Sequence, residues 1–300
     1  MPDHIGRYRI VERIGKGGMG TVYRAYDPQI CRTVAIKVLD THDEQFLVEV
    51  RAAGALKHRN VVTIYDCGRE DGQSIIVMEH IEGRTLAELL RTRQELPLAS
   101  KLRLIGQLCS GLGYAHERNI VHRDIKPANL MVDRDLQLKV LDFGIARIGD
   151  ASQREAGAVV GTLKSMSPEQ AAGRLVDRRS DIFSVGVVVY ELLSFRHPFP
   201  GETPAQVVHG VLHKQPTPLT ELCPELPPDY WRVVSTALQT DPDQRYASLA
   251  LMATDLAQIK SVAARPARYG GDAVAGFGKP LGWAGRAPGR GTSGASGFRA

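Results

Sequence analysis

The first part of the chain places apolar side chains in short runs that are typical of β-strands. Residues 8–14 alternate apolar and polar positions, which predicts a half-exposed strand, and residues 34–39 and 74–83 form further apolar runs. The triplet Asp66-Cys67-Gly68 and the pair Asp71-Gly72 have the composition of turns that join antiparallel strands. This part of the chain therefore predicts an antiparallel sheet.

Beyond Thr85 the spacing of apolar positions becomes helical. An amphipathic helix starting near Pro97 is predicted by apolar side chains at Leu102, Ile105, Leu108, Leu112 and Ala115. Residues 180–193 are apolar nearly all round, which predicts a fully buried helix. Thr203 and Ser248 can cap two later helices, the second reaching about Lys260. We therefore expect an α+β fold with a sheet-rich part followed by a larger helical part.

The formal net charge of +5 comes from one end of the chain. Residues 261–300 contain six Lys and Arg against a single Asp272, so the preceding residues carry equal numbers of acidic and basic side chains. Gly, Ala, Pro and Arg dominate this segment, which predicts a disordered tail or linker. Its thinly spaced charges favour a solvated tail, although contact with a membrane surface, an acidic partner or nucleic acid stays open. No specific nucleic-acid binding is expected.

The four cysteines lie far apart and have neither the spacing of zinc ligands nor that of a disulfide framework. They are Cys31, Cys67, Cys109 and Cys223. Residues 1–10 lack the apolar core of a secretory signal, and the apolar run 185–193 is too short to span a bilayer. We therefore expect a cytoplasmic protein. The sequence leaves open its oligomeric state and whether the natural chain continues past residue 300.

One polar cluster lies between short apolar runs: His122-Arg123-Asp124-Ile125-Lys126-Pro127-Ala128-Asn129, followed by Asp142-Phe143-Gly144. Phosphoryl transfer needs a hydroxyl held in line with the γ-phosphate, a cation on the phosphate oxygens and a bound metal ion. The two segments resemble the catalytic loop and the magnesium-binding loop of protein kinases. Either motif alone is as readily a turn or a polar surface, but their order and spacing together are specific.

The resemblance implies a role for each polar residue. Asp124 accepts the proton of the substrate hydroxyl, and Lys126 reaches the γ-phosphate. Asn129 and Asp142 hold Mg²⁺ (or Mn²⁺) through oxygen ligands. Val34-Ala35-Ile36-Lys37 resembles the kinase strand whose lysine, here Lys37, binds the α- and β-phosphates of ATP. We expect its carboxylate partner to be Glu49, with Glu44 as the alternative.

Gly15-Lys16-Gly17-Gly18-Met19-Gly20 has a glycine spacing that several nucleotide-binding folds share. A strand from Val22 follows it, whereas a dinucleotide fold opens a helix there, so the pattern favours the phosphate-covering hairpin of a kinase. The resemblance also makes Met78 the gatekeeper beside the adenine. The expected ATP contacts are Ile14, Gly15, Lys16, Gly17, Gly18, Met19, Gly20, Val22, Ala35, Lys37, Met78, Glu79, Ile81 and Met131.

The residues after Asp142 resemble the activation segment of a kinase. By this resemblance Thr162 bonds to Asp124 and Lys126, an arrangement that suits serine or threonine acceptors. Arg123 normally pairs with a phosphothreonine of that segment. The matching stretch here, Arg154-Glu155-Ala156-Gly157, has no hydroxyl. We therefore expect switching that does not use this phosphate.

Further residues have structural roles by the same resemblance. Asp181 is expected to be buried and bonded to the backbone of the catalytic loop. Glu169, in the triplet Ser167-Pro168-Glu169, is expected to form a buried ion pair with Arg245. Phe143 is expected to pack beside Ala53, where relatives carry a larger apolar side chain. This small residue predicts a weakly held helix and active state.

The chain most resembles bacterial-type serine/threonine protein kinases over residues 8–260. The resemblance implies a two-lobed fold, with a small antiparallel-sheet N-lobe over 8–81 and a mainly helical C-lobe over 82–260. It implies ATP-dependent phosphorylation of serine or threonine hydroxyls on protein substrates, in signalling with autophosphorylation. Ala53, the short helix and the missing threonines motivate an alternative, a catalytically weak nucleotide-binding scaffold. A small-molecule phosphotransferase of related fold is less favoured.

Overall fold

The structure is a computed structural model, and it describes residues 2–17, 20–39, 50–51, 53–70, 72–143 and 164–259. Within these ranges, the first part forms an antiparallel sheet with the order β1-β2-β3-β4-β6-β5. Its strands are β1 (His4–Ile5), β2 (Tyr8–Gly17), β3 (Gly20–Asp27), β4 (Arg32–Leu39), β5 (Ile64–Glu70) and β6 (Gln73–Glu79). The predicted antiparallel sheet is confirmed.

Successive side chains of the central strand β4 point to opposite faces of this sheet. Ile36 and Val38 pack with Tyr8 and the neighbouring strands on one face. Ala35 and Leu39 pack on the other face with Met78 and its neighbours. Because Lys37 shares the parity of Ala35 and Leu39, its side chain leaves the strand on this second face. The alternation thus places the lysine on the same side of the sheet as the second apolar cluster.

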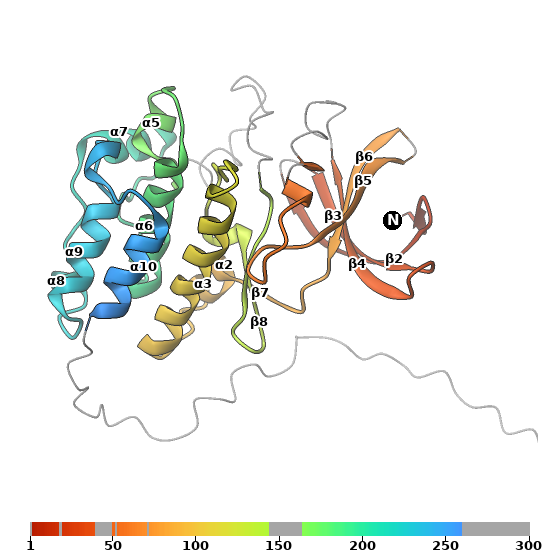
Figure 1. The fold of residues 1–300 in the computed structure, drawn as a ribbon, viewed down its shortest axis with the longest axis horizontal. Coiled ribbons are helices and arrows are strands. Elements are labelled where there is room, and N and C mark those ends of the chain that lie inside the picture. The colour runs from red at the N-terminus through yellow and green to blue at the C-terminus, as the bar shows by residue number, and fades with distance from the viewer. Residues whose placement is uncertain are drawn as a thin grey trace, which may run out of the picture. The chain divides into compact units, whose positions relative to one another are not determined.

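The second part of the chain is mainly helical, and three short strands form a separate small sheet in the order β7-β8-β9. These strands are β7 (Gly83–Thr85), β8 (Leu130–Asp133) and β9 (Leu138–Val140). The helices are α2 (Leu86–Arg91), α3 (Leu98–His116), η1 (Pro127–Asn129), α5 (Pro168–Ala171), α6 (Arg178–Ser194), α7 (Pro204–His213), α8 (Leu219–Leu222), α9 (Pro228–Ala237), η3 (Pro242–Gln244) and α10 (Leu249–Gln258). Figure 1 shows the larger sheet at one side, the later helices at the other, and β7 and β8 between them.

Helix α6 lies at the centre of the helical part, as its apolar sequence predicts. Its buried positions run from Ser180 to Leu193 with Glu191 as the exception. Close approach to α9 is possible because position 186 is glycine: a Cβ there would lie 2.9 Å from the Cβ of Ala237. The sheet-rich part and the larger helical part together give the two-lobed α+β fold expected from the sequence.

Most predicted element boundaries agree with the structure, and one prediction is wrong. Thr203 and Ser248 accept hydrogen bonds as N-caps of α7 and α10, although α10 ends at Gln258. Asp66-Cys67-Gly68 is not a turn but part of β5, just after a register shift between Ile64 and Asp66. The triplet pairs with β6, and the Asp66 carboxylate accepts a bond from the Tyr8 hydroxyl, so tertiary contacts hold this polar triplet in the strand.

The part of the chain that the structure describes has no helix that is both apolar and long enough to traverse a membrane.

A pair of glycine substitutions tests the packing of α6 against α9. Gly186→Ala should lower the free energy of unfolding by about 1–3 kcal/mol, because the added methyl meets Ala237 in a closely packed core. The same change at Gly106 of α3, where no atom lies within 4 Å of the new Cβ, should raise it by about 0.5–1 kcal/mol. Denaturant unfolding of both variants measures the difference, and equal effects would contradict the packing described.

Candidate active site

The segment between α3 and β8 carries the predicted catalytic loop. Asp181 of α6 binds the backbone at the beginning of this loop. The Asp181 side chain is fully buried. Its Oδ2 accepts from the backbone N–H of His122 and its Oδ1 from that of Arg123, both at 2.8 Å. His116 Nε2, at the end of α3, lies 2.7 Å from the same Oδ2. Three polar contacts to this carboxylate thus compensate its burial and fix the loop backbone.

The next residues of the loop bring three predicted polar side chains together. Lys126 Nζ lies 2.8 Å from Asp124 Oδ2. Asn129 Nδ2 donates to the same Asp124 Oδ2 at 3.0 Å and to the Asp124 carbonyl at 2.8 Å. Because the amide nitrogen of Asn129 faces Asp124, its carbonyl oxygen is directed elsewhere. A carboxylate, a cation and the nitrogen of an amide are therefore in mutual contact.

Asp142 meets Lys37 across a long sequence separation. Lys37 Nζ lies 2.8 Å from Asp142 Oδ2, and the two side chains are 9% and 27% exposed. Asp142 has a φ of 57° and Arg123 a φ of 68°, values that are rare for residues other than glycine. Strained backbone of this kind persists only where surrounding contacts over-determine it, and it clusters at functional sites. Lys37 of the sheet-rich part is thus in direct contact with Asp142, which follows β9.

The β8–β9 hairpin sets the positions of the two predicted metal ligands. Leu130 pairs with Val140, and the Leu141 N–H donates to the Asn129 carbonyl at 2.9 Å. Asn129 and Asp142 therefore lie at the same end of this hairpin. Their donors are amide and carboxylate oxygens, which suit a hard divalent cation. Within the described residues no cluster of three or more His, Cys, Asp or Glu could hold a metal, so phosphate or water oxygens must complete the coordination of any ion there.

The glycine-rich hairpin joins β2 to β3. Gly15 pairs with Val22, Lys16 with Thr21 and Gly17 with Gly20. Gly20 has a φ of 135°, and a Cβ there would lie 1.9 Å from the carbonyl oxygen of Val38. Only glycine therefore permits the close approach of β3 to β4 at position 20. Ile14 is half exposed, at 46%, on the same hairpin.

The predicted adenine contacts come from adjacent positions of the sheet. Val22 pairs with Lys37, and Ala35 pairs with Met78. The Glu79 N–H already donates to the Thr63 carbonyl at 2.9 Å, so Glu79 could offer a nucleotide only its carbonyl. Ile81 packs with the Ala35 cluster, and Met131 of β8 pairs with Lys139.

Phe143 is buried, and its ring centroid lies 4.7 Å from that of His122. The small side chain of Ala53 is also buried in the same core. A cavity of about 10 Å³ lies beside them, bordered by Val50 and Met78. Since a water molecule needs roughly this volume, the small residue at position 53 leaves only a minor void. The expected weakness of the helix stays a prediction, because residues 40–49 and 52 lie outside the described ranges.

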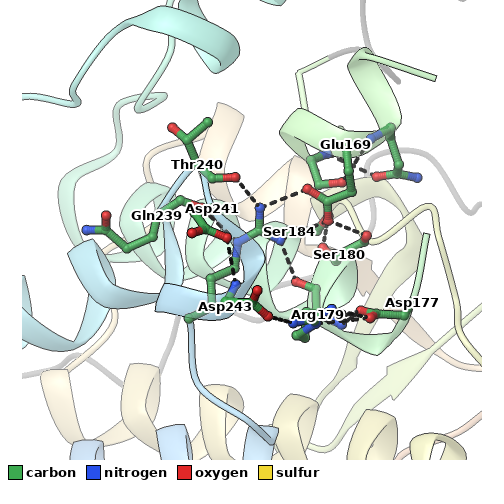
Figure 2. A network of polar contacts seen from close by, with 12 residues as sticks. Glu169, Asp177, Arg179, Ser180, Ser184, Gln239, Thr240, Asp241 and Asp243 are labelled. Atoms are coloured by element: carbon green, nitrogen blue, oxygen red, sulfur yellow. Dashed lines mark hydrogen bonds and ion pairs between the residues drawn. The ribbon is translucent and has the colours of Figure 1, made fainter. Parts of the chain in front are cut away.

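The predicted ion pair between Glu169 and Arg245 is present and buried. Arg245 Nη2 and Nη1 donate to the two carboxylate oxygens of Glu169 at 2.8 and 2.9 Å. The Ser180 hydroxyl also donates to Glu169, and Figure 2 shows these contacts in one network with Arg179, Asp177 and Asp243. Burial alone would raise the pKa of Glu169, but the bonds from Arg245 and Ser180 hold that pKa below its usual value.

Ser167, the first residue of the triplet Ser167-Pro168-Glu169, caps α5. Its side chain accepts from the Gln170 N–H, and the Gln170 side chain returns a bond to the Ser167 backbone. The Gln170 amide also donates to the Arg123 carbonyl at 2.7 Å. The capping box therefore links the segment that follows the activation segment to the catalytic loop.

Several predicted site residues lie outside the described ranges: Gly18, Met19, Glu49 and Thr162, together with the stretch Arg154-Glu155-Ala156-Gly157. Their roles stay predictions. The tail, residues 261–300, also lies outside these ranges.

Sequence reasoning missed three contacts that shape the site. His122 Nε2 lies 2.7 Å from the Leu141 carbonyl, which ties the catalytic loop to the segment of Asp142. His116 contacts Asp181, as described above. Lys139 Nζ lies 2.7 Å from Glu79 Oε2 and joins β9 to the end of β6. No local sequence pattern predicts these contacts, because each joins residues that are far apart in the sequence.

These features define a class of protein: a two-lobed fold that combines a glycine-rich hairpin and a buried lysine with a loop that carries a carboxylate, a lysine and an amide. The sequence profile described as "Protein kinase domain" matches residues 8–257. The chain therefore belongs to the protein kinase family and, within it, to the bacterial-type serine/threonine kinases.

Curated relatives include the probable serine/threonine-protein kinase SCO3848 of Streptomyces coelicolor, 41% identical over 265 residues, which cover 84% of this chain and 39% of that protein. Serine/threonine-protein kinase PknB of Mycolicibacterium smegmatis is 37% identical over 86% of this chain and 44% of its own length. Serine/threonine-protein kinase PknL of Mycobacterium tuberculosis is 37% identical over 87% of this chain and 67% of its own. The chain thus spans less than half the length of the first two relatives.

Substitutions in the Figure 2 network test the buried pair. Arg245→Met should lower the free energy of unfolding by about 3–5 kcal/mol, because it leaves the buried Glu169 carboxylate without its cation. Arg179→Met removes a partly exposed arginine of the same network and should cost at most about 1 kcal/mol. Denaturant unfolding of both variants provides the measurement. A loss for Arg245→Met as small as that for Arg179→Met would contradict the assignment.

The raised pKa of Glu191 predicts how the stability of the fold changes with pH. Partial burial raises the pKa of this α6 carboxyl to about 7, against the opposing effect of Lys164. Since the folded state holds the proton more tightly than the unfolded state, stability should fall as pH rises from about 4.5 through 7. Glu191→Gln should therefore be more stable than the parent at pH 8 and nearly equal to it at pH 4.5. Thermal unfolding at both pH values measures this.

The exposed Glu225→Gln is the control and should change stability by no more than about 0.5 kcal/mol at either pH. A stability difference between Glu191→Gln and the parent that does not change with pH would show that Glu191 does not titrate in this window.

Proposed function

We propose that this chain transfers the γ-phosphate of ATP to serine or threonine hydroxyls of protein substrates. The observation that carries the proposal is two neighbouring polar clusters, Lys37 with Asp142 and Asp124 with Lys126 and Asn129. The backbone bond from Leu141 to Asn129 joins the segments that carry them. The family membership supports ATP and protein as the two substrates. The names of the bacterial relatives support serine and threonine as acceptors.

Each side chain has a role that its contacts suit. Asp124, held by Lys126 and Asn129, orients the substrate hydroxyl and accepts its proton. Lys126 neutralises charge on the phosphoryl group, and Lys37 holds the remaining phosphates. Asn129 and Asp142 would hold Mg²⁺, the hard cation that an amide and a carboxylate oxygen favour alongside phosphate oxygens. When bound, the metal neutralises charge that develops on the phosphate oxygens.

Two expected roles belong to residues outside the described ranges. We propose Glu49 as the carboxylate partner of Lys37 in the active state, and Thr162 as the residue that contacts Asp124 and Lys126 beside the acceptor. No observation favours the weak-scaffold alternative. Contact of the tail with a membrane surface or an acidic partner stays a prediction about residues 261–300.

Two substitutions test the catalytic assignment. Lys37→Met and Asp142→Asn should each lower the rate of phosphate transfer by roughly 10²–10³, because each removes one preorganised charge from the site. The measurement is transfer from labelled ATP to a generic basic protein with Mg²⁺, with phosphoamino-acid analysis of the product. Circular dichroism should show that both variants remain folded.

Matched controls are Lys57→Met and Asp135→Asn, which change exposed residues of the same types. Both should keep the parental rate. Parental transfer by Lys37→Met and Asp142→Asn would remove these residues from the catalytic machinery, and label on tyrosine alone would contradict the proposed acceptor.

A further inference from the structure

Helix α7 ends with two histidines that lie one helical turn apart. His209 and His213 are both exposed and occupy positions i and i+4, so they share one side of the helix. Their ring centroids lie 5.0 Å apart with the ring planes tilted by 52°. The pair is far along the chain from the residues assigned to phosphate transfer.

Three other histidines of the described chain have polar partners in the core. His116 contacts Asp181, His122 contacts the Leu141 carbonyl, and His197 contacts the Lys164 carbonyl. His209 and His213 differ, since within the described residues the structure gives neither ring a hydrogen bond or an ion pair. Among the described residues, the aromatic ring that each histidine contacts is that of the other. Both imidazoles thus keep nitrogen lone pairs available on the surface.

The separation of the rings matches what chelation requires. A Zn²⁺–N bond of about 2.0–2.1 Å places each ring centre about 3.2 Å from the ion, and a tetrahedral angle then separates the centres by about 5.2 Å. A square-planar angle gives about 4.5 Å by the same geometry. The observed 5.0 Å lies between these values. The helix backbone therefore already holds the rings at a chelating distance.

We propose that His209 and His213 together bind one transition-metal ion of the Zn²⁺ or Cu²⁺ type, with water in the other coordination positions. Imidazole nitrogen suits these ions, whereas the oxygen donors of Asn129 and Asp142 suit Mg²⁺. The two sites are therefore chemically distinct. The bound ion joins two successive turns of the helix, so it stabilises the C-terminal end of α7.

The test is a titration of the metal-free chain with Zn²⁺ against a chromophoric chelator, without nucleotide and with excess Mg²⁺ to occupy oxygen sites. His209→Gln and His213→Gln should each weaken Zn²⁺ binding by about 10²-fold, because a single imidazole loses the benefit of the second ligand. His4→Gln, which removes an exposed histidine elsewhere, should keep the parental affinity. Parental affinity in both α7 variants, or no Zn²⁺ uptake by the parent, would overturn the proposal.

Electron paramagnetic resonance with one equivalent of Cu²⁺ gives a second readout. The parent should show hyperfine coupling to two imidazole nitrogens, and each α7 variant should lose one of them. An unchanged spectrum in both variants would place the ion elsewhere and contradict the assignment, whatever the affinity.

Discussion

The catalytic loop depends on one buried carboxylate, that of Asp181 in α6. It accepts two backbone N–H groups of the loop at 2.8 Å and lies 2.7 Å from His116. A buried charge without such partners would be strongly unfavourable, so the loop and the helix stabilise each other. Because α6 is packed on nearly all sides, the position of this carboxylate is set by the core of the helical part.

A strained backbone position and contacts from α5 lie next to the groups that Asp181 binds. Arg123 directly follows His122 and has a positive φ, and its carbonyl accepts a bond from Gln170 of α5. Glu169, the neighbour of Gln170, is held by Arg245 and Ser180. The loop that carries Asp124 is therefore fixed from α6 on one side and from α5 on the other. The buried core of the helical part thus sets the position of the loop that carries Asp124.

Periodicity and motif order predicted much of this molecule, and long-range contacts account for what they missed. Apolar spacing predicted the strands and the buried helix, and the order of motifs indicated Lys37, Asp124, Asn129 and Asp142 as one group. The strand at Asp66 was missed because pairing with β6 and the bond from Tyr8 override its turn-like composition. The contacts of His116 and His122 were missed because their partners, Asp181 and Leu141, are adjacent only after folding.

The most direct test of this account is Asp181→Asn, which keeps the size of the side chain but removes its charge and one acceptor. Hydrogen exchange should show faster exchange at the His122 and Arg123 amides in the variant. The kcat for phosphate transfer should fall by about 10²-fold through misplacement of Asp124, with a much smaller change in the KM for ATP. Protected amides together with a parental kcat would show that Asp181 does not position the catalytic loop.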